Sequence, residues 1–253
     1  RDSASKHIKN LVEQGSVERT VSAVPVCSLL SGGVDSSVIT LAAMNNIPNL
    51  VSYIAVHDEN SKDLRCAREV AEMLNIELVE VKVEPPTVDD VKDIINTIEM
   101  NYKAQIEIAW PCIKLAQRIA SDGFKVVLSG EGSDELWASY GMSYHGIEEH
   151  GFEEYRLRLF GSQERKNFSR CNKIFMKYGV ECRLPFLNTE LVETALGMEQ
   201  DIVWDTKSRP KAVLQDSYVN LLPEEIIKRP KMAFQDGMGI KNEFAKILDK
   251  NPK

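Results

Sequence analysis

The sequence of 253 residues contains none of the features that mark membrane-spanning or exported proteins. No run of about 18 apolar residues is present, so a membrane-spanning helix is not expected, and no signal peptide is recognisable. Positively charged residues are outnumbered, with 31 Lys and Arg against 38 Asp and Glu. No dense basic cluster indicates a nucleic-acid-binding surface. We therefore expect a cytoplasmic enzyme that binds neither membranes nor nucleic acids.

Cysteine and histidine are too few and too scattered to predict a metal site or a disulfide framework. The five cysteines are odd in number and never show the Cys-x-x-Cys spacing of zinc sites and redox motifs. His57, His145 and His150 form no metal-ligand spacing with one another or with cysteines. We expect reduced, mostly buried thiols at Cys27, Cys66, Cys112, Cys171 and Cys182.

The two most common nucleotide-binding signatures are also absent. A Walker-type loop requires a Gly-Lys pair before Ser or Thr, and the chain contains no Gly-Lys pair. The dinucleotide fingerprint fails because Gly130 and Gly132 lack the third glycine at the required distance. A nucleotide site in this chain therefore requires a loop of another type.

Such a loop is present from Leu29 to Ser37, in the run Leu-Leu-Ser-Gly-Gly-Val-Asp-Ser-Ser. The apolar residues before it and the apolar periodicity after it predict a strand, a tight turn and a helix. Unpaired backbone N–H groups at the start of such a helix lie at the positive end of its dipole and can hold phosphate oxygens. Asp35 would repel phosphate, so its expected role is to hold a Mg²⁺ that bridges the phosphates. An ordinary capped helix after a glycine-rich turn is the alternative interpretation.

The first half of the chain alternates short apolar runs with helical patterns, which is typical of parallel βαβ units. We predict a doubly wound α/β fold with a mainly parallel sheet. A helical lead-in is expected at residues 1–21, a nucleotide-binding core at 22–140 and a mostly helical portion at 141–253. The predicted strands are Val24–Leu30, Leu50–Val56, Glu77–Val83 and Lys125–Ser129, and the predicted helices are Ser36–Asn45, Lys62–Leu74, Val88–Met100 and Pro111–Ser121.

A second polar segment, from Ser129 to Glu135, follows the last of these strands and holds three carboxylates within a few residues. Carboxylates so close together repel one another unless a cation or a proton relieves them. Because ligands bind beyond the carboxyl ends of parallel strands, we expect this segment, the phosphate loop and residues 56–60 around one crevice. Asp134 would then give Mg²⁺ a second contact opposite Asp35. A solvated acidic loop is the alternative.

The run Ser-Gly-Gly-x-Asp-Ser-Ser resembles the pyrophosphate loop of the N-type ATP pyrophosphatases. Together with Ser-Gly-Glu-Gly-Ser-Asp-Glu it resembles the synthetase domain of the asparagine synthetases. Two later segments continue the likeness in the order that the family has them: Asn172-Lys173 with Tyr178–Leu187, and Arg229–Gly239. The chain is identified by these motifs as a member of that family from about Ser22 to Phe244.

The resemblance implies an AMP-forming carbon–nitrogen ligase. A carboxylate would attack the α-phosphorus of MgATP, pyrophosphate would leave, and ammonia or an amine would then displace AMP to form an amide. ATP and Mg²⁺ are the implied cofactors, with Asp35 and Asp134 on the metal. Glu131 would accept the proton of the second step, and Lys231 would neutralise the leaving pyrophosphate. ATP and pyrophosphate contacts are implied at Leu30, Ser31, Gly32, Gly33, Asp35, Ser36, Ser37, Val56, Ser129 and Gly130.

The acid to be activated is left open by a departure from the family pattern. Where the family has an arginine that meets the substrate, this chain has Glu107, and Trp110 replaces a small polar residue. A reversed charge cannot bind the same carboxylate at a partly buried site. We treat both residues as substrate-pocket candidates and expect an acid other than free aspartate, with a neutral or cationic group facing Glu107. A register shift that brings Lys114 or Arg118 to the site is the alternative.

The family also carries an N-terminal glutaminase domain, for which this sequence has no counterpart, and the chain does not begin with Met. We therefore expect a fragment or processed chain, with ammonia from a separate glutaminase chain or domain or from solution. A homodimer is compatible with the resemblance. The alternatives are a β-lactam synthetase-like or peptide-cyclase-like ligase, against the first of which Glu131 argues, and an inactive binding or scaffold homologue.

Overall fold

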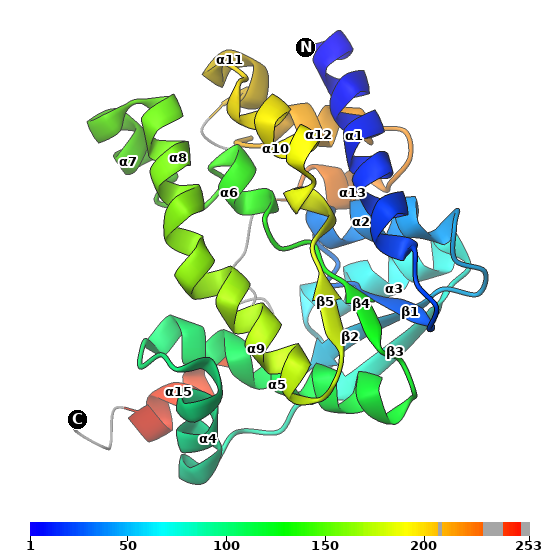
Figure 1. The fold of residues 1–253 in the computed structure, drawn as a ribbon, viewed down its shortest axis with the longest axis vertical. Helices are drawn as coiled ribbons and strands as arrows, with labels where there is room; N and C mark the ends of the chain where they lie inside the picture. The colour runs from blue at the N-terminus through cyan, green and yellow to red at the C-terminus, as the bar shows by residue number, and fades with distance from the viewer. Residues whose placement is uncertain (207–208, 230–239, 249–253) are drawn as a thin grey trace.

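The computed structural model describes residues 1–206, 209–229 and 240–248, and Figure 1 shows their arrangement. Five parallel strands form one sheet in the order β3-β2-β1-β4-β5. In the register of the sheet, Ser28 is paired with Ser52 on one side and with Leu128 on the other. The predicted α/β fold with a parallel sheet is confirmed. The strands are β1 (Val26–Leu29), β2 (Val51–Val56), β3 (Glu77–Lys82), β4 (Val126–Leu128) and β5 (Glu181–Arg183).

The strand order places the two polar loops next to each other. From β1 the chain proceeds outward to β2 and β3, whereas β4 and β5 are added on the other side of β1. The order therefore reverses between β1 and β4, and such a switch point opens a crevice beyond the carboxyl ends of the strands. The loops that follow β1 and β4 are the two that carry the polar motifs, so the topology brings them together.

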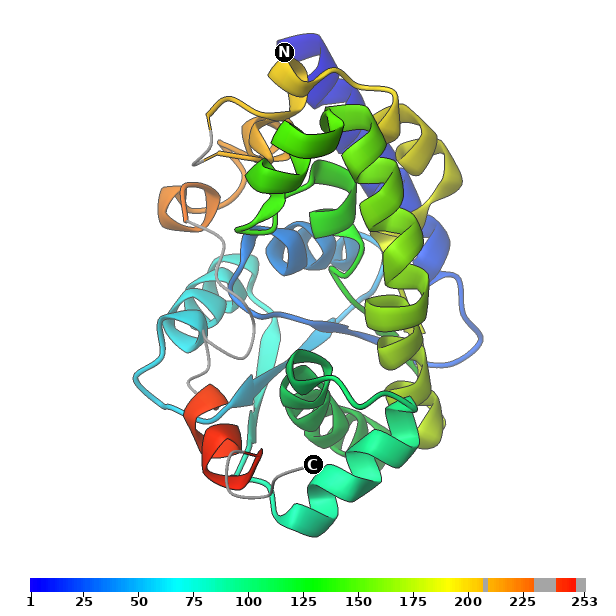
Figure 2. The same ribbon diagram turned by 90° about the vertical axis from the view of Figure 1, so that its left-hand side faces the viewer.

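Side chains of successive strand residues point alternately into two separate hydrophobic cores, one on each face of the sheet. In β2, Ile54 and Val56 belong to the core that α1, α2 and α3 cover, whereas Tyr53 and Ala55 belong to the core under α4, α5 and α9. Figure 2 shows the sheet edge-on between α2 and α5. These helices are α1 (Asp2–Thr20), α2 (Val34–Met44), α3 (Lys62–Leu74), α4 (Val88–Ile98), α5 (Lys103–Ser121) and α9 (Ser169–Lys177).

The helical lead-in is an integral layer of the molecule, because Ile8, Leu11 and Val12 of α1 are buried in the first core. The portion after residue 141 is mostly helical, but it also supplies β5, an edge strand that the sequence did not predict. Its remaining elements are α7 (Ser143–His150), α8 (Phe152–Gln163), η1 (Glu164–Phe168), η2 (Pro185–Leu187), α10 (Thr189–Leu196), α11 (Gln200–Val203), α12 (Ala212–Ser217), α13 (Glu224–Ile227) and α15 (Lys241–Leu248).

Helix α5 begins well before the predicted start at Pro111, since Lys103 is its first residue. A proline removes one backbone hydrogen bond from a helix interior, and for that reason the sequence suggested a boundary there. In the structure Pro111 lies buried inside the helix, and the apolar residues around it hold the helix together across the missing bond. The additional turns before Pro111 carry Ala104 and Ile108, two of the α5 residues that reach the crevice.

Two expectations from composition can be compared with the structure. No helix among the described residues is long and apolar enough to cross a membrane. The five cysteines are free thiols, and three of them are buried, which agrees with the predicted state. Cys171 of α9 and Cys182 of β5 are in contact, with their sulfur atoms 2.9 Å apart.

Candidate active site

The loop after β1 is shaped by one glycine that no other residue can replace without strain. Gly32 has a φ of +72°, in the left-handed region that side chains rarely adopt. A Cβ atom there would collide with the carbonyl oxygen of Asp63 and would lie 2.8 Å from the backbone nitrogen of Ala67, both in α3. The loop therefore packs directly on the start of α3, and Gly33 begins α2 as its N-cap.

Serine hydroxyls fix the loop from within. The backbone N–H of Ser31 donates to Ser36 Oγ at 3.0 Å, and the hydroxyls of Ser36 and Ser37 donate to the carbonyl of Gly33 at 3.2 and 2.8 Å. These bonds hold the first turn of α2 in place, where backbone N–H groups have no partner within the helix. The turn is thus a preformed anion-binding end with the dipole of α2 behind it.

A lysine joins the two polar loops. Lys211 Nζ lies 2.8 Å from both carboxylate oxygens of Asp35 and 2.9 Å from Asp134 Oδ1. Its side chain comes from the N-cap of α12 and is 3% exposed. Ser133 also donates to Asp35, at 2.7 Å, and Ser139 donates to Asp134 at 2.5 Å. Asp35 and Asp134 thus face the same point, as predicted, and an ammonium group stands between them.

The loop after β4 touches the start of α2 through a second glycine. A Cβ atom on Gly130 would lie 3.0 Å from the carbonyl carbon of Asp35 and 3.0 Å from the nitrogen of Ser36. A side chain at this position would push the two loops apart. Gly130 therefore sets the distance at which the carboxylates of the second loop face the turn at the start of α2. This loop leads into α6 (Ser133–Trp137).

Glu131 is held by an arginine from a distant helix. Arg170 Nη2 donates to Glu131 Oε1 at 2.8 Å, while Nη1 donates to Asn167 Oδ1 at 2.9 Å and to Gln105 Oε1. Arg170 is only 1% exposed, whereas the side chain of Glu131 is 29% exposed. A buried cation fixes this carboxylate in one orientation while leaving its other oxygen toward the cavity side.

Asn167 reaches this cluster from an unusual turn. It lies in η1, a π-helical turn between α8 and α9, and such turns often occur at functional sites. Its amide nitrogen donates to Glu135 Oε1 at 3.1 Å, and Tyr140 Oη donates to the same oxygen at 2.6 Å. Burial, together with the smaller effect of the charge of Glu131, raises the pKa of Glu135 to about 7.

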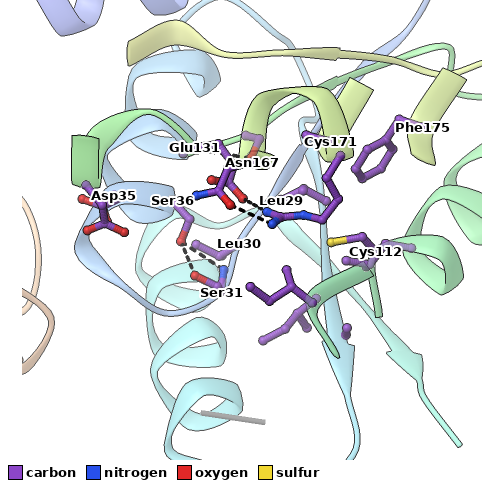
Figure 3. Close-up of a pocket in the computed structure, with 18 of the residues that line it drawn as sticks. Leu29, Leu30, Ser31, Asp35, Ser36, Cys112, Glu131, Asn167, Cys171 and Phe175 are labelled. Carbon is purple, nitrogen blue, oxygen red and sulfur yellow. Dashed lines mark hydrogen bonds and ion pairs between the residues drawn. The ribbon is translucent and has the colours of Figure 1, made fainter. Parts of the chain in front are cut away.

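The carboxylates of Asp35, Asp134 and Glu131 line one cavity of about 490 Å³ together with Asn167 and Arg170. Figure 3 shows Asp35 and Ser36 at one end of it, Glu131 and Asn167 in the middle, and Cys112 and Phe175 at the other end. The polar end is built from the two loops, and the apolar end lies between β1, β2, α5 and α9. The lining residues are Leu29, Leu30, Ser31, Asp35, Ser36, Tyr53, Ile54, Ala55, Tyr102, Ala104, Ile108, Cys112, Leu115, Ser129, Gly130, Glu131, Asp134, Tyr140, Asn167, Arg170, Cys171 and Phe175.

Most of the predicted site residues meet at this cavity. Those on its lining are Leu30, Ser31, Asp35, Ser36, Ser129, Gly130, Glu131 and Asp134. Gly32, Gly33 and Ser37 lie behind them in the same turn, and Val56 is buried at the end of β2, where Ile54 and Ala55 line the cavity instead. Lys231 falls outside the described residues.

The two substrate-pocket candidates lie elsewhere. Glu107 is 2% exposed within α5 and is not part of the lining. Trp110 donates its indole N–H to the carbonyl of Glu84 at 2.8 Å, and Lys114 lies over its ring at 4.0 Å from the centroid. Arg118 is paired with Asp122 at 2.8 Å. Helical periodicity explains the difference, because the predicted pocket position is on another face of α5 than the cavity.

Three site residues, Lys211, Arg170 and Asn167, were missed by sequence reasoning. For Lys211 a signal was present: the tripeptide Arg-Pro-Lys occurs at residues 209–211 and again at 229–231, and only the second was considered. Arg170 lies two residues before Asn172, where a segment with family likeness begins. Asn167 had no local signal, since only the π-helical turn brings it to the cavity.

Comparison with known proteins gives the context of this site. Residues 7–167 and 146–251 match the family model described as Asparagine synthase. The chain is 31% identical to an asparagine synthetase [glutamine-hydrolyzing] of Brassica oleracea, covering 92% of this chain and 42% of that protein. It is 28% identical to asparagine synthetase [glutamine-hydrolyzing] 3 of Arabidopsis thaliana, with 92% and 43% covered. The chain thus spans less than half the length of these curated relatives.

A solved structure shares the fold. The NMN synthetase from Francisella tularensis superposes with a TM-score of 0.50 over 99% of this chain and 87% of that one, at 18% sequence identity. At that identity the likeness concerns the arrangement of the sheet and its helices only.

Proposed function

The chain belongs to the asparagine synthase family, and from this premise we propose that it is an ATP-dependent, amide-forming ligase. It adenylates a carboxylate with release of pyrophosphate, and then transfers ammonia or an amine to the acyl group with release of AMP. One observation carries the proposal: a preformed anion-binding turn, a pair of carboxylates that share a cation, and an oriented glutamate all line one cavity. Each of these parts matches one requirement of the reaction.

The turn from Ser31 to Ser37 binds the polyphosphate of ATP. Its backbone N–H groups and the dipole of α2 stabilise the negative charge that develops as pyrophosphate leaves. Lys211 adds a positive charge near this end of the cavity, in contact with both loops. Because the turn is already held by its own serine hydroxyls, little reorganisation is needed when the nucleotide binds.

Asp35 and Asp134 fit a magnesium ion. The ammonium of Lys211 stands between the two carboxylates, which together carry one more negative charge than it neutralises. Two carboxylates combined with phosphate oxygens are a usual donor set for Mg²⁺ in nucleotide-using enzymes. A bound Mg²⁺ would offset the charge of the phosphates. The lysine would share these carboxylates with the ion or move from them to the phosphates.

Lys231 is proposed to act on the leaving pyrophosphate. The support comes from Arg229, whose guanidinium donates to the carbonyl of Gly32 at 3.1 Å and to Asp63. The chain therefore passes the phosphate-binding turn at residue 229, and two further residues extend at most about 7 Å.

Glu131 is proposed as the base of the second step. The attacking nitrogen must lose a proton as the amide forms, and a carboxylate at the edge of the cavity can accept it. Arg170 orients this carboxylate through one oxygen. The relatives of this chain hydrolyse glutamine, as their names state, so ammonia supplied by a glutaminase is the nitrogen source that we propose for it.

The test is ATP–pyrophosphate exchange by the purified chain in the presence of Mg²⁺ and a panel of carboxylic acids. We expect acid-dependent exchange in the wild type and a loss of about 100-fold or more in Asp35→Asn, because electrostatic groups at the reacting phosphates contribute that much. The matched control is Asp89→Asn, whose side chain is 89% exposed on α4. ATP binding without exchange with any acid would indicate a binding homologue, and unchanged exchange in Asp35→Asn would refute the proposed site.

A further inference from the structure

We propose that the acid activated in this site has an uncharged, apolar body next to its reacting carboxyl group, and that one face of α5 selects it. The inference rests on the proposed function and adds the class of substrate. It follows from what lines the cavity beside Glu131, from what the other faces of α5 carry, and from the charges that a second carboxylate would meet.

The acid must lie between the phosphate-binding turn and Glu131. From Glu131, the hydrogen bonds continue through Arg170 to Gln105, which belongs to the first turn of α5. The beginning of α5 is therefore the wall next to the proposed base. The two cavity-lining residues on either side of Gln105 along the helix are Ala104 and Ile108, with Tyr102 at the N-cap.

The face that α5 turns to the cavity is apolar along its whole length. Its lining residues are Ala104, Ile108, Cys112 and Leu115, at the spacing of one helical stripe. Phe175 of α9 also lines this end of the cavity. None of these side chains carries a charge or a strong hydrogen-bonding group, so the wall is suited to hydrocarbon.

The charged residues of α5 are on its other faces. Glu107 is buried within the helix packing and does not line the cavity. Lys114 is stacked on the ring of Trp110, and Arg118 is paired with Asp122. Lys103, the first residue of α5, is exposed. None of these three cations is part of the cavity lining, so α5 places no positive charge on its cavity face for a second carboxylate of the substrate.

The charges that do line the cavity are already paired. Among the described residues, Arg170 is the one cation on the lining, and its two terminal nitrogens already donate to Glu131, Asn167 and Gln105. Its remaining donor, Nε, is buried and has no hydrogen-bond partner among the described residues. Asp35, Glu131 and Asp134 line the same cavity as carboxylates. These carboxylates are paired with Arg170 and Lys211, so neither cation is left over for a further carboxylate. A dicarboxylic acid would thus bring an unpaired negative charge onto an apolar wall, whereas burying hydrocarbon there is favourable.

Two acids of similar shape and different charge test the inference. In 4-methylpentanoate an isopropyl group replaces the second carboxylate of succinate. We expect ATP–pyrophosphate exchange with 4-methylpentanoate to exceed exchange with succinate and with aspartate by at least about tenfold in kcat/KM. Pocket discrimination of this size is typical where an apolar wall meets a group that it does not fit.

A variant of the wall should reverse the preference. Ile108→Arg places a cation on the cavity face, and we expect the ratio of succinate to 4-methylpentanoate turnover to rise at least about tenfold. Gln117→Arg adds the same charge at an exposed position of α5, outside the lining, and should leave the ratio unchanged. Because a ratio within one variant is measured, partial loss of folded protein does not alter the result. For a variant that does not fold, Ala104→Lys is the substitute.

The outcomes separate the two proposals. Higher exchange with the apolar acid, together with the shift in Ile108→Arg, supports the inference. Aspartate or succinate as the better substrate overturns the inference and leaves the ligase activity standing. No exchange with any acid refutes the proposed function, and the substrate class with it.

Discussion

Two buried cations hold carboxylates at this site, and they do so in different ways. Lys211 contacts two carboxylates, Asp35 and Asp134, which leaves an excess of negative charge around it. Arg170 contacts one carboxylate, Glu131, and two neutral amide oxygens, so the charges at that cluster balance. The first cluster attracts a further cation, whereas the second is electrically complete. We infer that the lysine cluster exchanges partners when nucleotide and metal bind, and that the arginine cluster keeps one geometry throughout.

The largest loss of stability is expected from removing Arg170, the cation of the charge-balanced cluster. Arg170→Ala removes the cation from Glu131 and the donor from the amide oxygen of Gln105, whereas Asn167 Oδ1 keeps the hydrogen bond from the Gln105 amide. Losing one partner of a buried ion pair costs about 3–5 kcal/mol. Urea unfolding measures this loss, and Mg²⁺ should not restore it. Arg158→Ala, which breaks an exposed pair with Glu154 in α8, is the control. A loss below about 1 kcal/mol would contradict the role assigned to Arg170.

A smaller, rescuable loss is expected at the other cluster. Lys211→Met removes the ammonium group that Asp35 and Asp134 share, at a cost of about 2 kcal/mol for the lost charged hydrogen bonds. Because a divalent cation can take the place of the ammonium, millimolar Mg²⁺ should restore most of the stability by binding only the folded state. Thermal unfolding with Mg²⁺ or with EDTA measures both effects. Equal stability in the two conditions would show that the clusters do not differ as proposed.

The backbone under the lysine cluster is the third test. Gly32→Ala forces a side chain into a left-handed conformation against α3, which costs about 1–3 kcal/mol and moves the turn that binds phosphate. Gly161→Ala is a matched control, since its Cβ meets nothing within 4 Å inside α8 and should stabilise the protein by about 0.5–1 kcal/mol. Chemical denaturation and ATP binding measure the outcome. An unaltered ATP affinity in Gly32→Ala would argue against the turn as the phosphate site.

The smallest loss of stability is expected for an arginine–glutamate pair that is exposed to solvent, Arg68 with Glu80. Arg68 donates twice to Glu80, at 2.6 and 2.8 Å, and this hydrogen bonding lowers the pKa of the Glu80 carboxyl. Since the folded-state pKa is depressed, the stabilisation is present above the unfolded pKa and is lost as pH falls through the folded one. Glu80→Gln should therefore cost at most about 0.5–1 kcal/mol near pH 7 and nothing in acid. If Glu80→Gln lowered the stability as much as Arg170→Ala does, burial could not explain why the two ion pairs are expected to contribute differently.

Much of this architecture was predictable because it depends on local patterns. The strand–turn–helix at Leu29–Ser37 and the carboxylates after β4 follow from residue type and spacing, and the parallel sheet makes them neighbours. The start of α5 was not predictable, since Pro111 gives a boundary signal that tertiary packing overrides. Which residues of α5 face the cavity depends on the rotation of the helix about its axis, and the sequence does not give that rotation. Glu107 and Trp110 were therefore as plausible as Ala104 and Ile108. Lys211 lies 176 residues from Asp35, and only the fold brings them together.

The π-helical turn from Glu164 to Phe168 has a consequence for the whole column formed by α8 and α9. A single extra residue in a helix turns everything after it by about 100° relative to what precedes it. Arg170, Cys171 and Phe175 all follow the turn and all line the cavity. Deletion of one residue from this turn would rotate α9 about its axis relative to α8. The guanidinium of Arg170, the thiol of Cys171 and the ring of Phe175 would then leave the cavity together. The number of residues in this one turn therefore decides which side chains of α9 reach the cavity.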